Sequence, residues 1–187
     1  MKYKYSMSKK LLTVLIISLA LLFFFYLSRP PVNLENKNLI LSRECYQVIL
    51  KTIRGSSMEP LLKDGEKVKF LMDYYNCHPL SKNEIIVISF KTQPNKLYIK
   101  KLVGLPEDKV EIKNNYLFIN GQLVRNSENK PYLVQGKGET LLLKPLINQR
   151  ISDGYYLVLS EDPNSTAFDS RYFGYLEKTH ILGKVIK

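Results

Sequence analysis

An apolar run from Leu11 to Leu27 constrains this chain more than any other feature of its sequence. A helix that crosses a bilayer needs about 20 predominantly apolar residues, so the run is at the short end of that range. A cleaved secretory signal is the competing interpretation. The segment Phe24–Pro31 lacks small residues placed for processing, and the small pair Ser18 and Ala20 lies inside the run. We therefore expect an uncleaved membrane anchor.

The charges on either side of the run predict its orientation. The lysines that precede it are Lys2, Lys4, Lys9 and Lys10. Only Arg29 follows closely, and Pro30 and Pro31 then end the helix. By the positive-inside rule the N-terminus is cytoplasmic. We expect a single-pass protein of the inner or plasma membrane, with these parts: a cytoplasmic tail over 1–10, an anchor over 11–28, a linker over 29–38 and an extracytoplasmic domain over 39–187.

Composition allows one ordinary domain and restricts its partners. The 187 residues are 45% hydrophobic, which excludes a chain that is disordered over most of its length. The net charge of +11 favours anions, either nucleic acid or lipid headgroups. Cys45 and Cys77 have no CxxC spacing and no histidine cluster, so the sequence predicts neither a metal site nor a redox motif. One disulfide in an extracytoplasmic domain and two buried thiols both fit this pair.

Beyond residue 39 the pattern is that of β-structure. Short runs rich in β-branched and aromatic residues alternate with turn residues. We expect strands over 67–72, 84–90, 96–103, 110–112, 116–119, 122–124, 155–159 and 181–186. Asn114-Asn115 and Asn120-Gly121 predict hairpin turns, since these residues adopt the positive φ of a type I′ turn. Residues 125–153 indicate an insertion or a long crossover. The predicted fold class is a mainly β domain on a membrane tether.

The stretch Arg54–Pro60 places two serines, Ser56 and Ser57, behind a glycine and ahead of a Met-x-Pro. A serine in that setting is held on a turn, which exposes its hydroxyl. Ordinary loop chemistry also explains a lone Gly-Ser-Ser. A serine nucleophile needs a base, and neither His78 nor His180 is flanked by an orienting acid. The sequence therefore argues against a Ser-His-Asp triad.

Lysine is the alternative base, provided that its amine is neutral. Desolvation lowers the pKa of a lysine, so a candidate should lie on a strand among apolar residues. The pair Lys100-Lys101 fits best. Strand alternation directs one of the two inward with Tyr98 and Leu102 and leaves the other in solvent. A solvated edge lysine is the ordinary alternative for either residue.

Three motifs now occur in a recognisable order. They are Gly-x-Ser-Met-x-Pro at Gly55–Pro60, Tyr-Ile-Lys-Lys-Leu-Val-Gly-Leu-Pro-x-Asp-Lys-Val at Tyr98–Val110, and Phe-Asp-Ser-Arg-Tyr-Phe-Gly at Phe168–Gly174. Together they resemble the type I signal peptidase family, which are membrane-bound serine proteases with a Ser/Lys dyad. The resemblance covers the whole predicted extracytoplasmic domain. The motifs also resemble the conjugative-transfer pilin peptidases, a sister branch with the same dyad.

The resemblance implies roles for individual residues. Ser57, which directly precedes Met58-x-Pro60, would be the nucleophile, and Ser56 its neighbour. Lys100 would be the general base, and Lys101 the basic residue that follows it in the family.

The surroundings of the dyad follow from the same resemblance. The Ser57 backbone N–H would meet the oxyanion, with Gly55 where some members place an assisting hydroxyl. Met58 would line the substrate cleft. Asp169 and Arg171 would support the geometry of the site rather than react.

Two of this chain's departures from the family bear on the predicted dyad, and Gly65-Glu66 in place of the more usual Gly-Asp is a milder change. Ser160-Glu161-Asp162 stands where the family commonly has Gly-Asp-Asn, and Ala167 replaces a serine two residues before Asp169. That serine would hydrogen-bond the lysine amine. A hydroxyl from Ser165, Thr166 or Ser170 would have to substitute for it.

The resemblance implies removal of leader peptides from exported precursors through an acyl-enzyme, after small residues at the first and third positions before the bond. The implied partners are precursors that bear signal peptides, and membrane lipids. We expect no cofactor, metal or nucleic acid. Two other classes compete with this function. A cytoplasmic self-cleaving Ser/Lys repressor would lack the Leu11–Leu27 anchor, and a non-catalytic membrane-tethered β module would explain charge and strands without chemistry.

Overall fold

The computed structural model describes residues 45–164 and 168–187. The predicted tail (1–10), anchor (11–28) and linker (29–38) lie outside these residues. Within them, no helix has the length and apolar character needed to cross a membrane. The described domain is mainly β, as predicted, with two antiparallel sheets and a few short helices.

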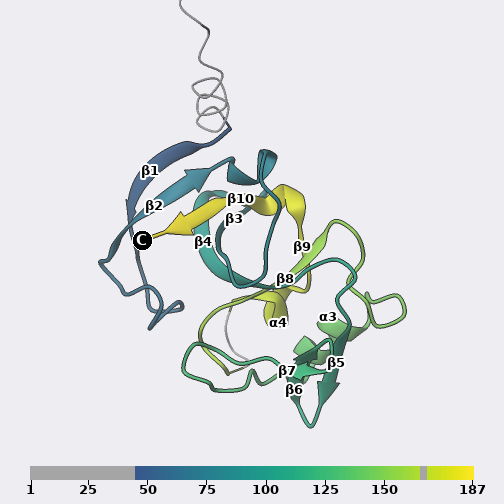
Figure 1. Cartoon of the computed structure of the whole chain (residues 1–187). Helices are drawn as coiled ribbons and strands as arrows, with labels where there is room; N and C mark the ends of the chain where they lie inside the picture. The colour runs from purple at the N-terminus through teal and green to yellow at the C-terminus, as the bar shows by residue number, and fades with distance from the viewer. Residues whose placement is uncertain (1–44, 165–167) are drawn as a thin grey trace, which may run out of the picture. The chain divides into compact units, whose positions relative to one another are not determined.

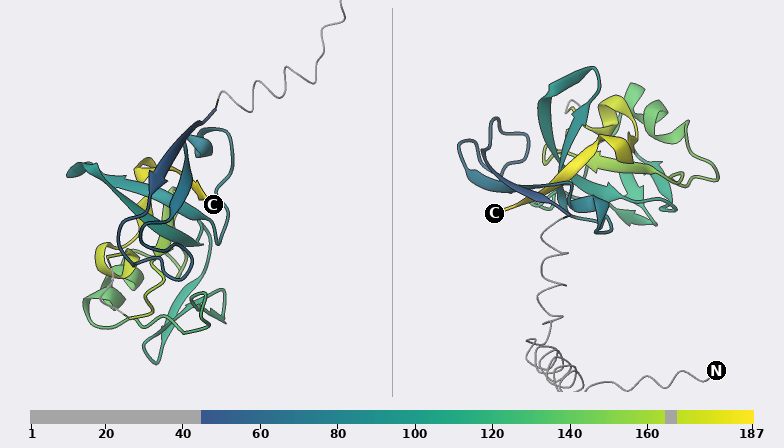
Figure 2. Two further views of the ribbon diagram at one scale, coloured as in Figure 1. Left: turned by 90° about the vertical axis from the view of Figure 1, so that its left-hand side faces the viewer. Right: turned by 90° about the horizontal axis from the view of Figure 1, so that it is seen from above.

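A seven-stranded antiparallel sheet forms the larger part of the domain (Figure 1). Its strands in spatial order are β1 (Gln47–Thr52), β2 (Lys67–Met72), β10 (Ile181–Ile186), β3 (Ile85–Phe90), β4 (Gln93–Gly104), β8 (Tyr155–Leu159) and β9 (Leu176–Glu177). The last strand of the chain, β10, is yellow in Figure 2 and pairs with both β2 and β3. The sheet therefore joins segments from both ends of the domain.

A smaller sheet and two short helices form the other end of the domain, away from β1 (Figure 1). The sheet contains β5 (Val110–Lys113), β6 (Tyr116–Ile119) and β7 (Gln122–Leu123). The α-helices are α3 (Lys137–Leu143) and α4 (Ser170–Phe173), and the 3-10 helices are η1 (Tyr74–Asn76) and η2 (Lys178–His180). The predicted insertion over 125–153 thus contains α3.

Every predicted strand is present, and both predicted hairpin turns are confirmed. Asn114 and Asn115 have φ of 53° and 65°, and Asn120 and Gly121 have φ of 51° and 77°. Positive φ at both central residues is the requirement of a type I′ turn. The sequence pattern missed β1 because all six of its residues are exposed, so it shows no alternation of buried and exposed positions.

The apolar core has three clusters, and two of them position the residues of interest. One contains Met58 together with Val68 and Val87, and so anchors the turn that follows β1. Another contains Ile86 and Leu102, and lies against the middle of β4. The turn and the strand are thereby held by separate parts of one packed domain.

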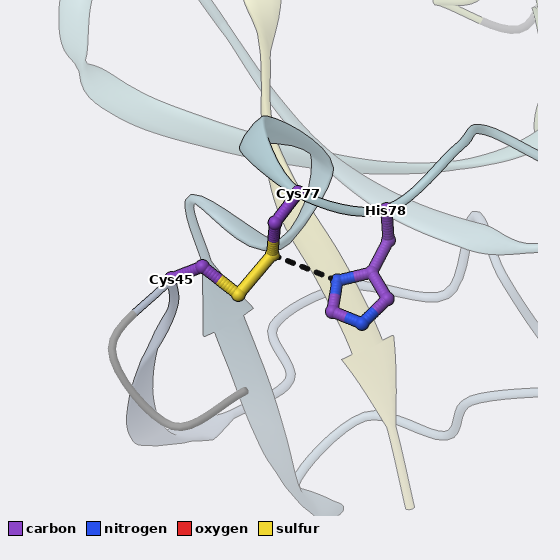
Figure 3. Close-up of side chains that lie close together, drawn as sticks. All are labelled: Cys45, Cys77 and His78. Carbon is purple, nitrogen blue, oxygen red and sulfur yellow. Dashed lines mark hydrogen bonds between the residues drawn. A yellow bond between two sulfur atoms is a disulfide. The ribbon is translucent and has the colours of Figure 1, made fainter. Parts of the chain in front are cut away.

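Cys45 and Cys77 form a disulfide (Figure 3), with Cα atoms 6.1 Å apart. The interpretation of two buried thiols is wrong, and Cys77 is exposed. The bond links the residue two positions before β1 to the end of η1.

Candidate active site

A cleft of about 390 Å³ lies between the end of β1 with its following turn and the strand β4. Both Ser57 and Lys100 line this cleft, although they are far apart in sequence. Ser56 is not among its lining residues, which distinguishes the two candidate serines. The lining residues are Lys51, Thr52, Ile53, Arg54, Gly55, Ser57, Met58, Phe70, Asn95, Lys96, Leu97, Tyr98, Ile99 and Lys100.

Ser57 lies on a turn and is exposed, as its sequence context predicted. Its carbonyl oxygen accepts a hydrogen bond of 2.8 Å from the Glu161 N–H. Across residues 45–164 and 168–187, nothing accepts a hydrogen bond from the Ser57 N–H, so this donor is available to a ligand in the cleft. Met58 lines the cleft and is 2% exposed, which fixes the turn against the core.

Gly55 supports the turn through its backbone. Its φ of +89° lies in a region that residues with a Cβ atom rarely adopt, which favours glycine at this position. The Gly55 N–H donates a 2.7 Å hydrogen bond to Asp64 Oδ1. Gly55 therefore contributes shape to the cleft wall, and no side-chain hydroxyl.

Lys100 is 3% exposed on β4. Burial lowers the pKa of its amine, because desolvation disfavours the ammonium form. The Asp169 carboxylate opposes this shift and raises the Lys100 pKa, while the Arg171 guanidinium lowers it. Within the described residues, no hydrogen bond or salt bridge holds the Lys100 amine. This is the environment that a lysine base requires.

The expectation that the other lysine of the pair stays in solvent is wrong. The Lys101 side chain is 14% exposed, and its Nζ lies 3.6 Å from Glu161 Oε1. Strand alternation does place Lys100 and Lys101 on opposite faces, but the segment after β8 covers the second face. Glu161 Oε1 accepts no hydrogen bond within the described part of the chain, so Lys101 is its counter-ion there.

Asp169 and Arg171 form an ion pair with no exposed side-chain surface. Arg171 Nη2 donates to Asp169 Oδ2 at 2.7 Å, and Arg171 Nε donates to Oδ1 at 3.0 Å. Asp169 Oδ2 also accepts from the Ser160 N–H and from Ser160 Oγ, each at 3.0 Å. Arg171 donates further to the carbonyl oxygens of Asp162 and Pro163.

The ion pair thus fastens the segment that follows β8. That segment then reaches both halves of the candidate site: its Glu161 N–H holds the Ser57 carbonyl, and its Glu161 carboxylate pairs with Lys101 beside Lys100. The sequence had marked Glu161 only as a departure from the family pattern. A carboxylate two residues after an apolar strand was the signal for a buried ionic contact, although it did not identify Lys101 as the partner.

The hydroxyl that would replace the family serine is not supplied by Ser170. Its Oγ accepts a 2.9 Å hydrogen bond from the Val158 N–H inside the core and makes no bond to Lys100. Ser165, Thr166 and Ala167 lie outside the described residues. The two histidines, His78 and His180, do not line the cleft.

An exposed serine with a free backbone N–H, and a buried lysine with a lowered pKa, are together the groups of a serine hydrolase that uses lysine as base. The cleft thus contains the groups that this class of protein needs, on a mainly β domain. Comparison with known proteins gives the particular family. The family model "Signal peptidase, peptidase S26" matches residues 39–187, and the chain belongs to this family.

Curated relatives agree with this assignment. Signal peptidase IB of Staphylococcus aureus strain Mu50 is 37% identical over 147 residues, which are 72% of this chain and 73% of the relative. Signal peptidase I of Bacillus caldolyticus is 32% identical over 138 residues, which are 71% of this chain and 74% of the relative. A crystal structure of a signal peptidase I from Enterococcus faecalis V583 is 26% identical, with a TM-score of 0.44, and covers 58% of this chain and 98% of that one. The assignment rests on the family model and the sequence relatives.

Proposed function

We propose that this chain removes leader peptides from exported precursor proteins, with Ser57 as nucleophile and Lys100 as general base. The family makes the chain a serine endopeptidase. The observation that carries the assignment of residues is that exposed Ser57 and buried Lys100, whose pKa is lowered, line one cleft.

The chemistry follows from these two groups. The neutral amine of Lys100 takes the Ser57 proton as the hydroxyl oxygen attacks the peptide carbonyl. The Ser57 N–H faces the developing oxyanion, and the Lys100 ammonium then gives its proton to the leaving amine. The leader remains as an ester on Ser57. A water molecule deprotonated by Lys100 hydrolyses this acyl-enzyme and restores the site.

The precursor binds as an extended segment in the cleft. The walls come from the end of β1 and from β4, so a segment between them adds to the sheet through backbone hydrogen bonds. The apolar residues Met58, Phe70 and Ile99 are among those that line the cleft. Shallow apolar subsites select small side chains before the scissile bond, because larger ones clash.

Asp169, Arg171 and Glu161 act as positioning residues in this proposal. The ion pair fixes the segment after β8, and Glu161 in turn holds the carbonyl of Ser57 and pairs with Lys101. None of the three reacts with substrate.

The proposal includes the membrane topology expected from the sequence. Residues 11–28 anchor the chain, residues 1–10 are cytoplasmic, and the linker 29–38 leads to an extracytoplasmic catalytic domain over 39–187. An anchor places enzyme and precursor on one surface, which raises their effective concentration. The +11 charge favours contact with anionic lipid headgroups.

The test uses the full chain in detergent with one secretory precursor and one pilin precursor. We expect Ser57→Ala to abolish cleavage and its neighbour Ser56→Ala to retain most of it. Cleavage of the pilin precursor alone would assign the chain to the conjugative-transfer branch. Undiminished cleavage by Ser57→Ala would refute the nucleophile. No cleavage of either precursor by the unmodified chain would favour a non-catalytic module.

A further inference from the structure

Positive charge gathers along the candidate cleft. Besides Lys100, three of the lining residues are cations: Lys51 and Arg54 on one wall, and Lys96 on the other. Of the described residues that line the cleft, none is an aspartate or a glutamate. All three cations are exposed residues, so their charges meet whatever enters the cleft. The proposed hydrolysis uses none of these three side chains, and they need a separate explanation.

These cations have no acidic partner in the part of the chain that the structure describes. The salt bridges formed there do not include Lys51, Arg54 or Lys96. Lys96 Nζ instead lies over the ring of Tyr98, 4.9 Å from its centroid, and Tyr98 itself lines the cleft. The face of an aromatic ring attracts a cation. The Lys96 ammonium is therefore held beside the cleft without a carboxylate to neutralise it.

The backbone of β4 offers an open strand edge beside these charges. Among the described residues, β8 pairs with β4 only at Lys101, Leu102 and Gly104. The earlier residues of β4 pair with β3 on one edge and have no paired strand on the other. An extended peptide that adds to this open edge runs alongside the stretch from Lys96 to Lys100.

The spacing along β4 determines which peptide position faces Lys96. Lys96 precedes Lys100 by four residues on this strand, and a strand rises about 3.3 Å per residue, so roughly 13 Å separates the two positions. The proposed function places Lys100 beside the scissile bond, and places the residues before that bond in the cleft. Because a lysine side chain is long and flexible, Lys96 then reaches the side chain about four to six residues before the bond.

We propose that Lys96, together with Lys51 and Arg54 on the facing wall, selects precursors that carry an aspartate or glutamate about four to six residues before the scissile bond. This inference rests on the proposed function, which assigns Ser57 and Lys100 to that bond. A carboxylate at this position is attracted by the three cations, and no lining carboxylate repels it. The attraction is the same in the bound substrate and in the transition state, so it lowers KM and leaves kcat unchanged.

The first experiment measures cleavage of matched precursor peptides by the full chain in a non-ionic detergent. The peptides carry aspartate, asparagine or lysine at one position, about four to six residues before the bond, and are otherwise identical. We expect kcat/KM for the aspartate peptide to exceed that for the asparagine peptide about two- to fivefold, as exposed ion pairs allow, and the lysine peptide to be cleaved least. The difference should lie in KM and shrink at about 1 M salt, where charges are screened. Equal kcat/KM for aspartate and asparagine at every position, or a difference in kcat alone, would overturn the proposal.

The second experiment assigns the preference to Lys96. Lys96→Gln removes a charge from the cleft wall, whereas Lys91→Gln removes an exposed lysine from the turn between β3 and β4 that does not line the cleft, and is the matched control. We expect the ratio of kcat/KM for the aspartate peptide to that for the asparagine peptide to fall in Lys96→Gln and to stay the same in Lys91→Gln. Lys96→Glu should lower the ratio further. Equal ratios in the two glutamine variants would contradict the role of Lys96.

Binding separates this inference from the proposed function. Ser57→Ala keeps the three cations and removes the proposed nucleophile, so the Kd of fluorescent aspartate and asparagine peptides is measured on this variant by anisotropy. Tighter binding of the aspartate peptide, with no cleavage of either peptide by the unmodified chain, would support anion recognition in the cleft and refute leader-peptide removal. Equal Kd and equal cleavage would refute the selection and leave the peptidase function standing. Loss of binding to phosphatidylglycerol vesicles in Lys96→Gln, with unchanged peptide ratios, would assign Lys96 to lipid headgroups and overturn the proposal.

Discussion

Asp169→Asn and Arg171→Met break the same ion pair from opposite sides. Neither side chain of the pair has exposed surface, and Nη2 and Oδ2 are 2.7 Å apart. Removing one partner of a buried pair leaves the other charge unpaired, which typically costs about 3–5 kcal/mol of the free energy of unfolding. For a domain of this size each kcal/mol lowers the melting temperature by about 2–4 °C. We expect both variants to melt roughly 6–20 °C below the unmodified chain.

The two variants should shift the pH dependence of activity in opposite directions. Asp169 raises the pKa of Lys100, and Arg171 lowers it. Because Lys100 must be neutral to act as base, kcat/KM rises with pH through the Lys100 pKa. Asp169→Asn lowers that pKa further, so the rising limb moves to lower pH. Arg171→Met raises the pKa, so the limb moves to higher pH.

Urea denaturation gives the loss of stability. The value of kcat/KM is measured on a precursor peptide over a range of pH, at a temperature below the melting temperatures of both variants. Glu107→Gln is the control, since it removes an exposed carboxylate that is not among the groups shifting Lys100. A purely structural role for the ion pair would lower activity without opposite shifts of the limb. Shifts in one direction, or losses of stability below about 1 kcal/mol, would refute this account of the pair.

Three further changes test other contacts. Lys100→Met should raise the free energy of unfolding at neutral pH, because it removes a buried amine that resists protonation. Between the lowered pKa of folded Lys100 and its unfolded pKa of about 10.4, the unfolded chain binds more protons, so stability rises with pH in that window. Urea melts at several pH values should show that the variant loses this slope. Cys77→Ser should lower the free energy of unfolding by about 3–4 kcal/mol relative to the oxidised chain, because the disulfide closes a loop between residues separated by 32 positions. An unchanged urea melt would contradict this. Glu161→Gln should lower the free energy of unfolding by about 1–2 kcal/mol, because it leaves Lys101 without its counter-ion. A double-mutant cycle with Lys101→Met should show that the two side chains are energetically coupled.

Local chemistry explains why much of the fold could be predicted from the sequence. Asn114-Asn115 and Asn120-Gly121 specify their hairpins through backbone preferences that need no distant partner. The strand 116–119 alternates buried residues with less buried ones, so its bounds are visible in the pattern. Lys100 was a candidate for the same reason, because its neighbours along the strand are apolar.

Features that depend on distant partners were not visible in the same way. β1 is exposed throughout and is defined only by its register with β2. The contact between Lys101 on β4 and Glu161, two residues after the end of β8, depends on the pairing of these two strands, and the sequence does not identify the two residues as partners. The sequence left open whether the two cysteines form a disulfide or stay as buried thiols. Only the structure shows that Cys45 lies next to the end of η1 and pairs with Cys77.

The most direct test of the central claim compares two adjacent lysines on β4. Lys100→Met and Lys101→Met make the same substitution at adjacent positions of one strand, but of the two lysines only Lys100 lines the cleft with Ser57. We expect Lys100→Met to lower the rate of precursor cleavage by about 10²–10⁴-fold, the contribution of a general base, and Lys101→Met to lower it much less. Retention of most of the rate by Lys100→Met, or equal losses in the two variants, would contradict Lys100 as the base that activates Ser57.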